Sequence, residues 1–243
     1  MYAIFVKEVS GFFSSLTGYI AATVFLVVIG LVMWVFPGSL NVLDSEYSTL
    51  ETLFTIAPWV FLFLVPAITM KTFAEEKKNG TIELILTRPI SDTNLVLGKF
   101  FASVLLVLII LIPSLIFYLS VFLLGNPIGN IDTGGTWGSF IGLFFLASSY
   151  AAIGIFASSL TDNQIVSFII ALIISLFALW GFDSLASLSL FSGIKFTLVS
   201  FGINEHYSSM SRGVIDTRDL VYFVCLVCVF IIATRIRIQS RKW

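Results

Sequence analysis

The chain has 243 residues, of which 58% are hydrophobic and 11% are charged, and its formal net charge is −1. A soluble domain usually carries about 25% charged residues, so this chain has too little polar surface to cover a water-soluble globule. A net charge near zero also gives no indication of a nucleic-acid-binding surface, and we expect no nucleic acid among the partners. The composition therefore indicates an integral membrane protein.

Six segments are predicted to cross the membrane as helices. A spanning helix needs about 20 mostly apolar residues, because each residue adds about 1.5 Å across a hydrocarbon core about 30 Å thick. The five clear segments, none with a charged side chain, are Leu16–Phe36, Thr52–Met70, Phe100–Leu124, Trp137–Leu160 and Ile165–Phe182. The sixth, Leu220–Thr234, is short and extends through Ile236 if Arg235 and Arg237 snorkel to the interface. The predicted fold class is all-α, with one polytopic transmembrane domain over residues 1–243.

The distribution of basic residues predicts the orientation in the membrane. The loops 37–51 and 125–136 contain no Lys or Arg, whereas basic residues flank the opposite ends of the spans. These are Lys7, Lys71, Lys77, Lys78, Arg88, Lys99, Arg235, Arg237, Arg241 and Lys242. Because basic residues are retained on the cytoplasmic side, both termini and the segment 71–99 are predicted to be cytoplasmic. This orientation requires an even number of spans.

Residues 1–15 are predicted to form a separate helix along the inner membrane surface. Phe5, Val9, Phe12, Phe13 and Leu16 recur at helical spacing, and polar residues occupy positions between them. An amphipathic helix of this kind lies in the interface with its apolar face in the lipid. The alternative interpretation is a frayed beginning of the first span.

The stretch Leu185–Ile203, within the segment 183–219, is apolar enough to resemble a seventh span. Gly193 and Lys195 divide it into two runs of about eight residues, and each run would extend only about 12 Å as a helix. A full span here would also place the basic C-terminus outside. We therefore predict an external or re-entrant helical pair, which is tolerable at membrane depth only where other helices bury it.

The cytoplasmic loop 71–95 has the features of a docking surface for a partner. Asn79 and Gly80 predict a sharp turn after an extension of the second span. Thr81 is predicted to cap a short helix with Glu83 in its first turn, where the helix dipole favours an anion. We expect Glu76 and Glu83 to contact basic groups on a partner.

The same loop is longer than a connection between two helices requires. Arg88 and Pro89 are predicted to end the short helix, and Ser91 or Asp92 to cap the third span. Connections between helices usually need about 2–8 residues. The extra length favours docking of a cytoplasmic protein, and an inert loop is the alternative.

Other residues do not form a recognisable catalytic or cofactor site. Cys225 and Cys228 have redox spacing but lie in a membrane helix, where we expect two small packing residues. A single histidine, His206, makes a His-rich metal site implausible. Gly98 and Lys99 lack the upstream glycine of a P-loop, so we expect ATP on a separate subunit. No catalytic, metal-binding or cofactor-binding residue, and no enzymatic activity of this chain, is therefore expected.

Small residues line one face of the fourth predicted span. Ala147, Ala151, Gly154 and Ser158 are spaced at helical intervals, after Gly138 and Gly142. Small residues allow helix backbones to approach closely in lipid. They pack either within the chain, which we slightly favour, or against a second subunit.

At the cytoplasmic loop the sequence resembles the ABC-2 type exporter permeases. The similarity lies in the run FAEEKKNGTIEL at residues 73–84, followed by Pro89. Within that group the chain resembles the permease subunit of the gliding-motility-associated ABC transporter of Bacteroidetes-type bacteria. This closer resemblance includes the runs FFSSLTGY at residues 12–19, PAITM at 66–70 and SRGVIDTRD at 211–219.

The resemblance implies six transmembrane helices, an N-terminal connecting helix and a coupling element that docks on a cytoplasmic ABC ATPase subunit. It also implies a second permease subunit, identical or different, and surrounding membrane lipid. An accessory extracytoplasmic subunit is a further expected partner, and the expected location is the bacterial inner membrane. The expected ATPase-coupling residues are Glu75, Glu76, Gly80, Thr81, Glu83, Arg88 and Pro89.

The spans also lack the ionisable residues that ion-driven carriers usually place at mid-membrane. We therefore predict the transmembrane permease subunit of an ATP-driven ABC-2 type transporter, associated with gliding motility or cell-surface export. The alternative is a non-transporting membrane scaffold or assembly subunit of a surface machine. A polytopic membrane enzyme is a third reading, but it would require a catalytic grouping that the sequence does not offer.

Overall fold

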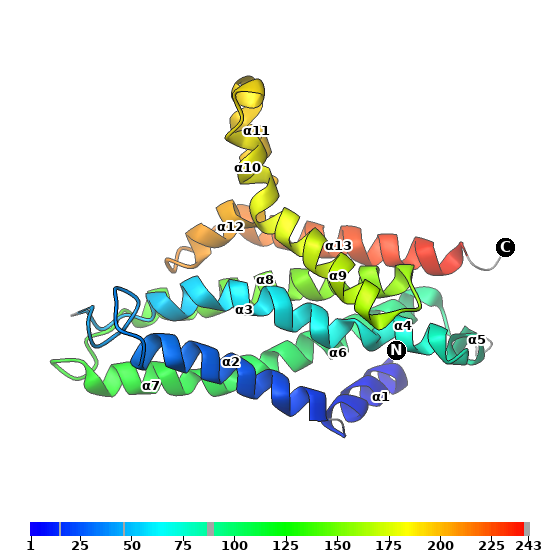
Figure 1. The fold of residues 1–243 in the computed structure, drawn as a ribbon, viewed down its shortest axis with the longest axis horizontal. Helices are drawn as coiled ribbons and strands as arrows, with labels where there is room; N and C mark the ends of the chain where they lie inside the picture. The colour runs from blue at the N-terminus through cyan, green and yellow to red at the C-terminus, as the bar shows by residue number, and fades with distance from the viewer. Residues whose placement is uncertain (15, 46, 87–89, 241–243) are drawn as a thin grey trace.

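The computed structural model describes residues 1–14, 16–45, 47–86 and 90–240. Within these ranges the chain folds into helices joined by turns and loops, without a β-strand. Figure 1 shows the long helices running side by side along the longest axis of the molecule. The arrangement is a helical bundle from which one short segment projects.

Long helices occupy the positions of the predicted spans. They are α2 (Leu16–Trp34), α3 (Glu51–Thr69), α6 (Asp92–Leu111), α7 (Leu115–Leu124), α8 (Thr133–Leu160), α9 (Gln164–Leu176) and α13 (Thr217–Gln239). The short helices are α1 (Tyr2–Phe13), α4 (Lys71–Lys78), α5 (Thr81–Leu86), α10 (Phe182–Ala186), α11 (Lys195–Val199) and α12 (Ile203–Met210). A 3₁₀ turn at Ile112–Ser114 joins α6 to α7, and a π-helical turn at Phe177–Gly181 joins α9 to α10.

Five helical segments in the described residues are long and apolar enough to cross a membrane. A sixth crossing results when α1 and the Gly18–Trp34 part of α2, which meet at a bend of 65°, count as one span. The all-α polytopic fold class is therefore confirmed. The bend also separates α1 from α2, as expected for residues 1–15.

The third predicted span is not one uniform helix. Pro113 lies in the 3₁₀ turn between α6 and α7. Proline has no backbone N–H and its ring crowds the preceding turn, so the regular hydrogen-bond ladder is interrupted there. The segment nevertheless continues from Asp92 to Leu124 as one candidate crossing.

The helix α8 forms the centre of the bundle, packing against α3, α6, α9 and α13. A Cβ atom at Gly154 would lie 2.0 Å from Oγ1 of Thr69 in α3, and one at Gly142 would lie 2.6 Å from the Cβ of Met210 in α12. Only glycine permits such close approach of two helices. The small residues of the fourth span therefore pack within the chain.

The two ends of the bundle differ in what they carry. Figure 1 shows the loops that follow α2 and α7 at one end, and the N-terminus, α4, α5 and the C-terminal end of α13 at the other. This arrangement agrees with an even number of crossings. The assignment of the second end to the cytoplasm stays a prediction based on the basic residues.

Residues 182–199, which comprise α10, the 3₁₀ turn Ser189–Ile194 and α11, form a lateral arm. Figure 1 shows this arm leaving the bundle across the direction of the long helices. The predicted pair of short helices is therefore present. In the single chain other helices do not cover the arm, because Ile194 is 52% exposed and Phe196 is 91% exposed. Its external or re-entrant position stays a prediction.

His206 connects the base of the arm to α13. Its Nδ1 lies 2.7 Å from Oδ1 of Asp219 and its Nε2 lies 2.9 Å from the carbonyl oxygen of Ser200. The ring also stacks on Tyr222, with 3.9 Å between ring centroids. Both ring nitrogens thus face oxygen atoms, and the ring holds the base of the arm against the beginning of α13.

The outer surface of α13 contains the cysteine pair. Cys225 and Cys228 are both exposed and free. Within the single chain the two side chains therefore do not belong to the helical core, and a packing role against lipid or another chain stays a prediction.

We expect labelling of single cysteines to report the predicted topology. In a background with Cys225→Ala and Cys228→Ala, three exposed positions should react with a membrane-impermeant thiol reagent in intact cells: Ser39→Cys, Asn130→Cys and Val214→Cys. Lys78→Cys and Ser240→Cys should react only after permeabilisation, because basic residues hold that end inside. Labelling of position 240 in intact cells would contradict an even number of spans.

Candidate coupling site

The junction between α3 and α4 is held by a side chain of the central helix α8. Oγ of Ser158 in α8 accepts hydrogen bonds from the backbone N–H groups of Phe73 (2.9 Å) and Ala74 (3.0 Å). It also donates to the carbonyl oxygen of Met70 at 3.0 Å. The first N–H groups of a helix can lack intrahelical partners, and here a hydroxyl of α8 supplies one. The beginning of α4 is thereby fixed to α8.

A buried lysine connects α4 to α1 and α6. Nζ of Lys99 lies 2.8 Å from Oε1 of Glu8, 2.6 Å from the carbonyl oxygen of Thr72 and 3.0 Å from Oε2 of Glu76. The first two contacts are hydrogen bonds. The third is an ionic contact without hydrogen-bond alignment, since Oε2 of Glu76 has no hydrogen-bond partner. Lys7 completes the cluster by donating to Oε1 of Glu76 at 2.8 Å.

The cluster of Lys7, Glu8, Glu76 and Lys99 contains two positive and two negative side chains. The side chain of Lys99 is 1% exposed and that of Glu76 is 10% exposed, so neither charge is well solvated. A buried charge is tolerated when opposite charges and hydrogen bonds replace its water. We call these four side chains the buried charge cluster.

Lys7 is the solvent-facing member of the buried charge cluster, and its side chain is 61% exposed. Partial burial alone would lower the pKa of Lys7. The hydrogen bond to Glu76 and the negative charges of Glu76 and Glu8 outweigh that effect and raise the pKa above its ordinary value. Lys7 therefore remains positively charged beside Glu76 at neutral pH.

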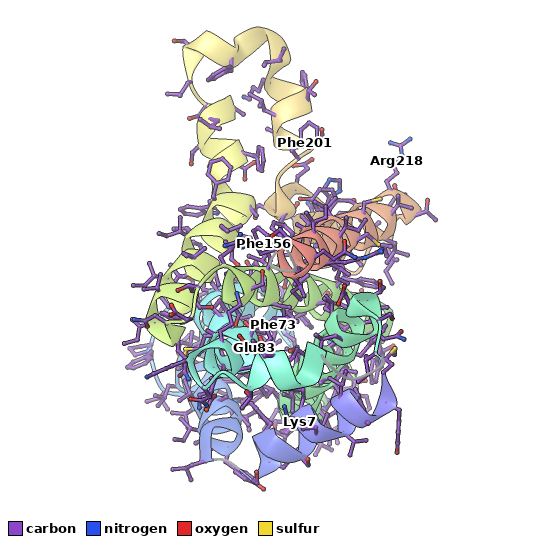
Figure 2. All side chains as sticks on the ribbon, turned by 90° about the vertical axis from the view of Figure 1, so that its right-hand side faces the viewer. Lys7, Phe73, Glu83, Phe156, Phe201 and Arg218 are labelled. Atoms are coloured by element: carbon purple, nitrogen blue, oxygen red, sulfur yellow. The ribbon has the colours of Figure 1, made fainter. Side chains whose placement is uncertain are left out.

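Close contact between α1 and α6 brings the cluster together. A Cβ atom at Gly98 would lie 3.2 Å from the side chain of Ile4 and from the carbonyl oxygen of Met1. The lack of a side chain at Gly98 lets α1 lie on α6, one residue before Lys99. Figure 2 looks at this end of the molecule and shows Lys7 on α1, below the region of Phe73 and Glu83.

The turn between α4 and α5 has the predicted form. Gly80 has φ +69°, and a Cβ atom there would meet nothing within 4 Å. A larger residue would fit in space but would require a left-handed conformation that favours glycine. Glu83 lies in the first turn of α5 and is exposed, also as predicted.

Thr81 is the first residue of α5, and its hydroxyl donates to the carbonyl oxygen of Glu76 at 3.3 Å. The hydroxyl thus connects the beginning of α5 to α4. That Thr81 also caps α5 stays a prediction. Ser91 caps α6 as predicted by accepting from the N–H of Asn94.

The remaining predicted coupling residues differ in their positions. Glu75 is exposed, whereas the carboxylate of Glu76 points inward to Lys7 and Lys99. The prediction that Glu76 directly contacts basic groups of a partner therefore conflicts with its burial. Arg88 and Pro89 lie outside the described residues.

Sequence reasoning missed two residues that hold this site together. The sequence indicates Lys99 only as a basic residue on the cytoplasmic side of the third span, whereas in the structure its ammonium group is buried among Glu8, Thr72 and Glu76. Ser158 was noticed only as a small residue in a stripe. Its position one helical repeat after Gly154 is a signal of close packing, but the stripe alone does not reveal which backbone groups it binds.

A sequence model that describes an ABC-2 family transporter protein matches residues 7–234. The match includes the charge cluster, the turn at Gly80 and every helix from α2 to α12. The chain belongs to the ABC-2 transporter family. Comparison with curated protein sequences finds no match.

Membership in this family establishes the general role of the helical bundle. The ABC-2 protein is the membrane-embedded permease component, which is itself non-catalytic and works with a partner ATPase subunit. The α4–α5 hairpin, at the end that carries both termini, is therefore the candidate coupling site of a permease.

We expect Lys99→Met to lower the free energy of unfolding by about 3–5 kcal/mol, because it leaves two carboxylates without their buried cation. Thermal or denaturant unfolding of the purified protein in detergent measures the effect. Glu76→Gln in the same chain should recover part of the loss by removing one stranded charge. Lys78→Met, at an exposed lysine of α4, is the matched control and should change stability by less than about 0.5 kcal/mol. Equal effects of Lys99→Met and Lys78→Met would contradict a structural role of the cluster.

Proposed function

We propose that this ABC-2 permease receives mechanical force from its ATPase through the α4–α5 hairpin. The observation that carries the proposal is the combination of an exposed α5 turn with an α4 that is bonded to three other helices. Ser158 binds α4 to α8, and the buried charge cluster binds it to α1 and α6. A displacement of α5 would thus be passed to several helices at once.

The coupling residues divide into two groups in this proposal. Gly80, Thr81 and Glu83 form the face that meets the ATPase, with the carboxylate of Glu83 contacting a basic group. Glu76 acts on the inner side, where it keeps α4 attached to Lys7 and Lys99, and the exposed Glu75 lies beside it on α4. Arg88 and Pro89 belong to the same loop and are proposed to complete the docking surface.

We propose that a second permease subunit, identical or different, pairs with this chain. In the segment Gln164–Ala186 only 28% of the most apolar stretch is buried, and in α13 only 17%. The corresponding share in α8 is 78%. These two segments therefore offer the apolar surface that a partner helix or lipid requires. ATP is proposed to bind to the ATPase subunit alone, and an accessory extracytoplasmic subunit is a further proposed partner.

The biological setting is proposed from the sequence resemblance. Residues 12–19, 66–70 and 211–219 resemble the permease of the gliding-motility-associated ABC transporter. On this basis the protein lies in the bacterial inner membrane, with both termini in the cytoplasm, and serves gliding motility or cell-surface export.

Two substitutions test the docking face. Gly80→Val should insert into the membrane normally but distort the turn, because a β-branched residue is strained at φ +69°. Glu83→Lys should replace an attraction by a repulsion, which can cost several kcal/mol at an interface. Both should lose the co-purifying ATPase, or lose stimulation of its ATP hydrolysis in reconstituted vesicles.

Matched variants separate the proposed contacts from general damage. Gly80→Asn should retain coupling, because asparagine tolerates the left-handed conformation better than valine. Glu83→Gln should have a smaller effect than Glu83→Lys, since it removes a charge without reversing it. If Gly80→Val and Glu83→Lys bind and stimulate the ATPase like the parent, the hairpin is an inert connection.

A further inference from the structure

A polar cavity and an apolar groove meet at the end of the bundle that carries α4. The polar cavity has a volume of about 410 Å³ and lies between α1, α4 and α6. The apolar groove has a volume of about 660 Å³ and lies over α3, between α2 and α9. Ala67 and Ile68 line both, so the two spaces adjoin at this part of α3. We call the two spaces together the slot.

The dimensions of the apolar groove match those of a lipid chain. Along α3 its lining extends from Ile56 to Met70, which is about 21 Å at helical rise. One leaflet of a bilayer is about 15 Å deep, half of a hydrocarbon core about 30 Å thick. Figure 1 shows α3 lying between α2 and α9, with α9 crossing the end of α3 near α4. The apolar groove can therefore hold an acyl chain that enters from the α4 end.

The far end of the apolar groove is bounded by aromatic side chains. Trp59 of α3 lines the groove, and its ring lies edge-to-face with that of Trp180, 4.9 Å between centroids. This contact joins α3 to the π-helical turn after α9. Phe168, on α9, lines the same groove nearer to the α4 end.

The charges of the polar cavity indicate what kind of headgroup fits it. Lys7, Glu8 and Glu76 line the cavity but belong to the buried charge cluster, which Lys99 makes neutral. The other two charged lining residues are Lys71 and Glu75. Among the described residues neither of these forms an ion pair, so one cation and one anion face the cavity without an ionic partner.

Lys71 and Glu75 are positioned for two opposite charges on one ligand. They are four residues apart on α4, a spacing that places Cβ atoms about 5–6 Å apart. Lysine before glutamate is the less favourable order for pairing along a helix, which leaves both groups available. A phosphate that bears an ethanolamine group carries a negative and a positive charge separated by a two-carbon linker, which is a comparable distance.

We propose that the slot binds a zwitterionic phospholipid of the phosphatidylethanolamine class. Its phosphate lies at Lys71, its ammonium group at Glu75, and one acyl chain lies along α3 between α2 and α9. An anionic lipid without an ammonium group would leave the carboxylate of Glu75 without a positively charged partner. A helix of a second chain would fill the apolar groove but would leave the charges of Lys71 and Glu75 unmatched. The proposal rests on membrane embedding and does not depend on coupling to an ATPase.

Lipid retention tests the proposal. The full chain is produced in membranes that contain phosphatidylethanolamine and phosphatidylglycerol, extracted in mild detergent, washed, and its bound lipids are quantified by mass spectrometry. The parent should retain phosphatidylethanolamine in preference to phosphatidylglycerol. Lys71→Ala should reduce the retained phosphatidylethanolamine about tenfold, the effect of losing one charge-assisted hydrogen bond. Glu75→Gln should lower the ratio of phosphatidylethanolamine to phosphatidylglycerol, because it removes the group that discriminates between them.

A blocking variant and two controls complete the experiment. Ala67→Trp places a large side chain where the polar cavity joins the apolar groove, at an exposed residue, and should also abolish preferential retention. Leu119→Trp, at an exposed residue of α7, and Lys78→Ala, on α4 outside the slot, should retain lipid like the parent. The unfolding midpoint of each variant is compared with that of the parent to detect loss of folding. If Ala67→Trp fails to fold, Lys71→Ala still tests the proposal.

Three results would overturn the proposal. Equal retention of both lipids by the parent would mean that only unspecific surrounding lipid is bound. Unchanged retention in Lys71→Ala would mean that the polar cavity does not select the headgroup. The third result concerns the mass of the protein in detergent, measured by light scattering. If Ala67→Trp has a smaller mass than the parent but retains the same lipid, a second copy of the chain occupies the apolar groove.

Discussion

The ammonium group of Lys99 constrains the end of the bundle that carries α4 in a way that the apolar contacts there cannot. A lysine that is 1% exposed cannot stay charged without oxygen partners at close range. Those partners come from Glu8 on α1 and from Thr72 and Glu76 on α4. Apolar surfaces can slide against one another at small cost, but these distances cannot change much without exposing a buried charge. The three helices α1, α4 and α6 are therefore held in one relative position.

The core helix α8 and the charge cluster fix α4 from two sides. The hydroxyl of Ser158 binds the backbone at the beginning of α4, whereas Glu76 binds through its side chain one turn later. Beyond this point the chain turns at Gly80, and the exposed Glu83 follows on α5. The firmly attached helix α4 thus lies directly before the exposed turn. A surface that meets a partner is thereby backed by a support that stays in place.

Much of this fold is predictable from the sequence because the membrane imposes simple rules. Length and hydropathy identify the spans, and the turn at Gly80 follows from a residue that accepts positive φ. Pairings between distant residues have no comparable signal. Lys99 precedes an apolar run by one position, which looks like a cytoplasmic flank until α1 and α4 are seen to surround it. Glu75 and Glu76 are adjacent and chemically alike. Which of the two carboxylates points into the bundle depends on how α4 is rotated about its axis, and the sequence does not specify that rotation. The exposure of the lateral arm likewise depends on packing that a single sequence does not specify.

The contact of Gly154 with Thr69 has a geometrical consequence for α3 and α4. These two helices run together from Glu51 to Lys78 as one candidate crossing of 28 residues, and α8 approaches them closely at Thr69, opposite Gly154. Thr69 is 18 residues from Glu51 and 9 from Lys78, or about 27 Å and about 13 Å at helical rise. A rigid rod pivoting at that contact would act as a lever with arms in a ratio of about two. A movement of about 1 Å at the end of α4 would then swing the far end of α3 by about 2 Å in the opposite direction.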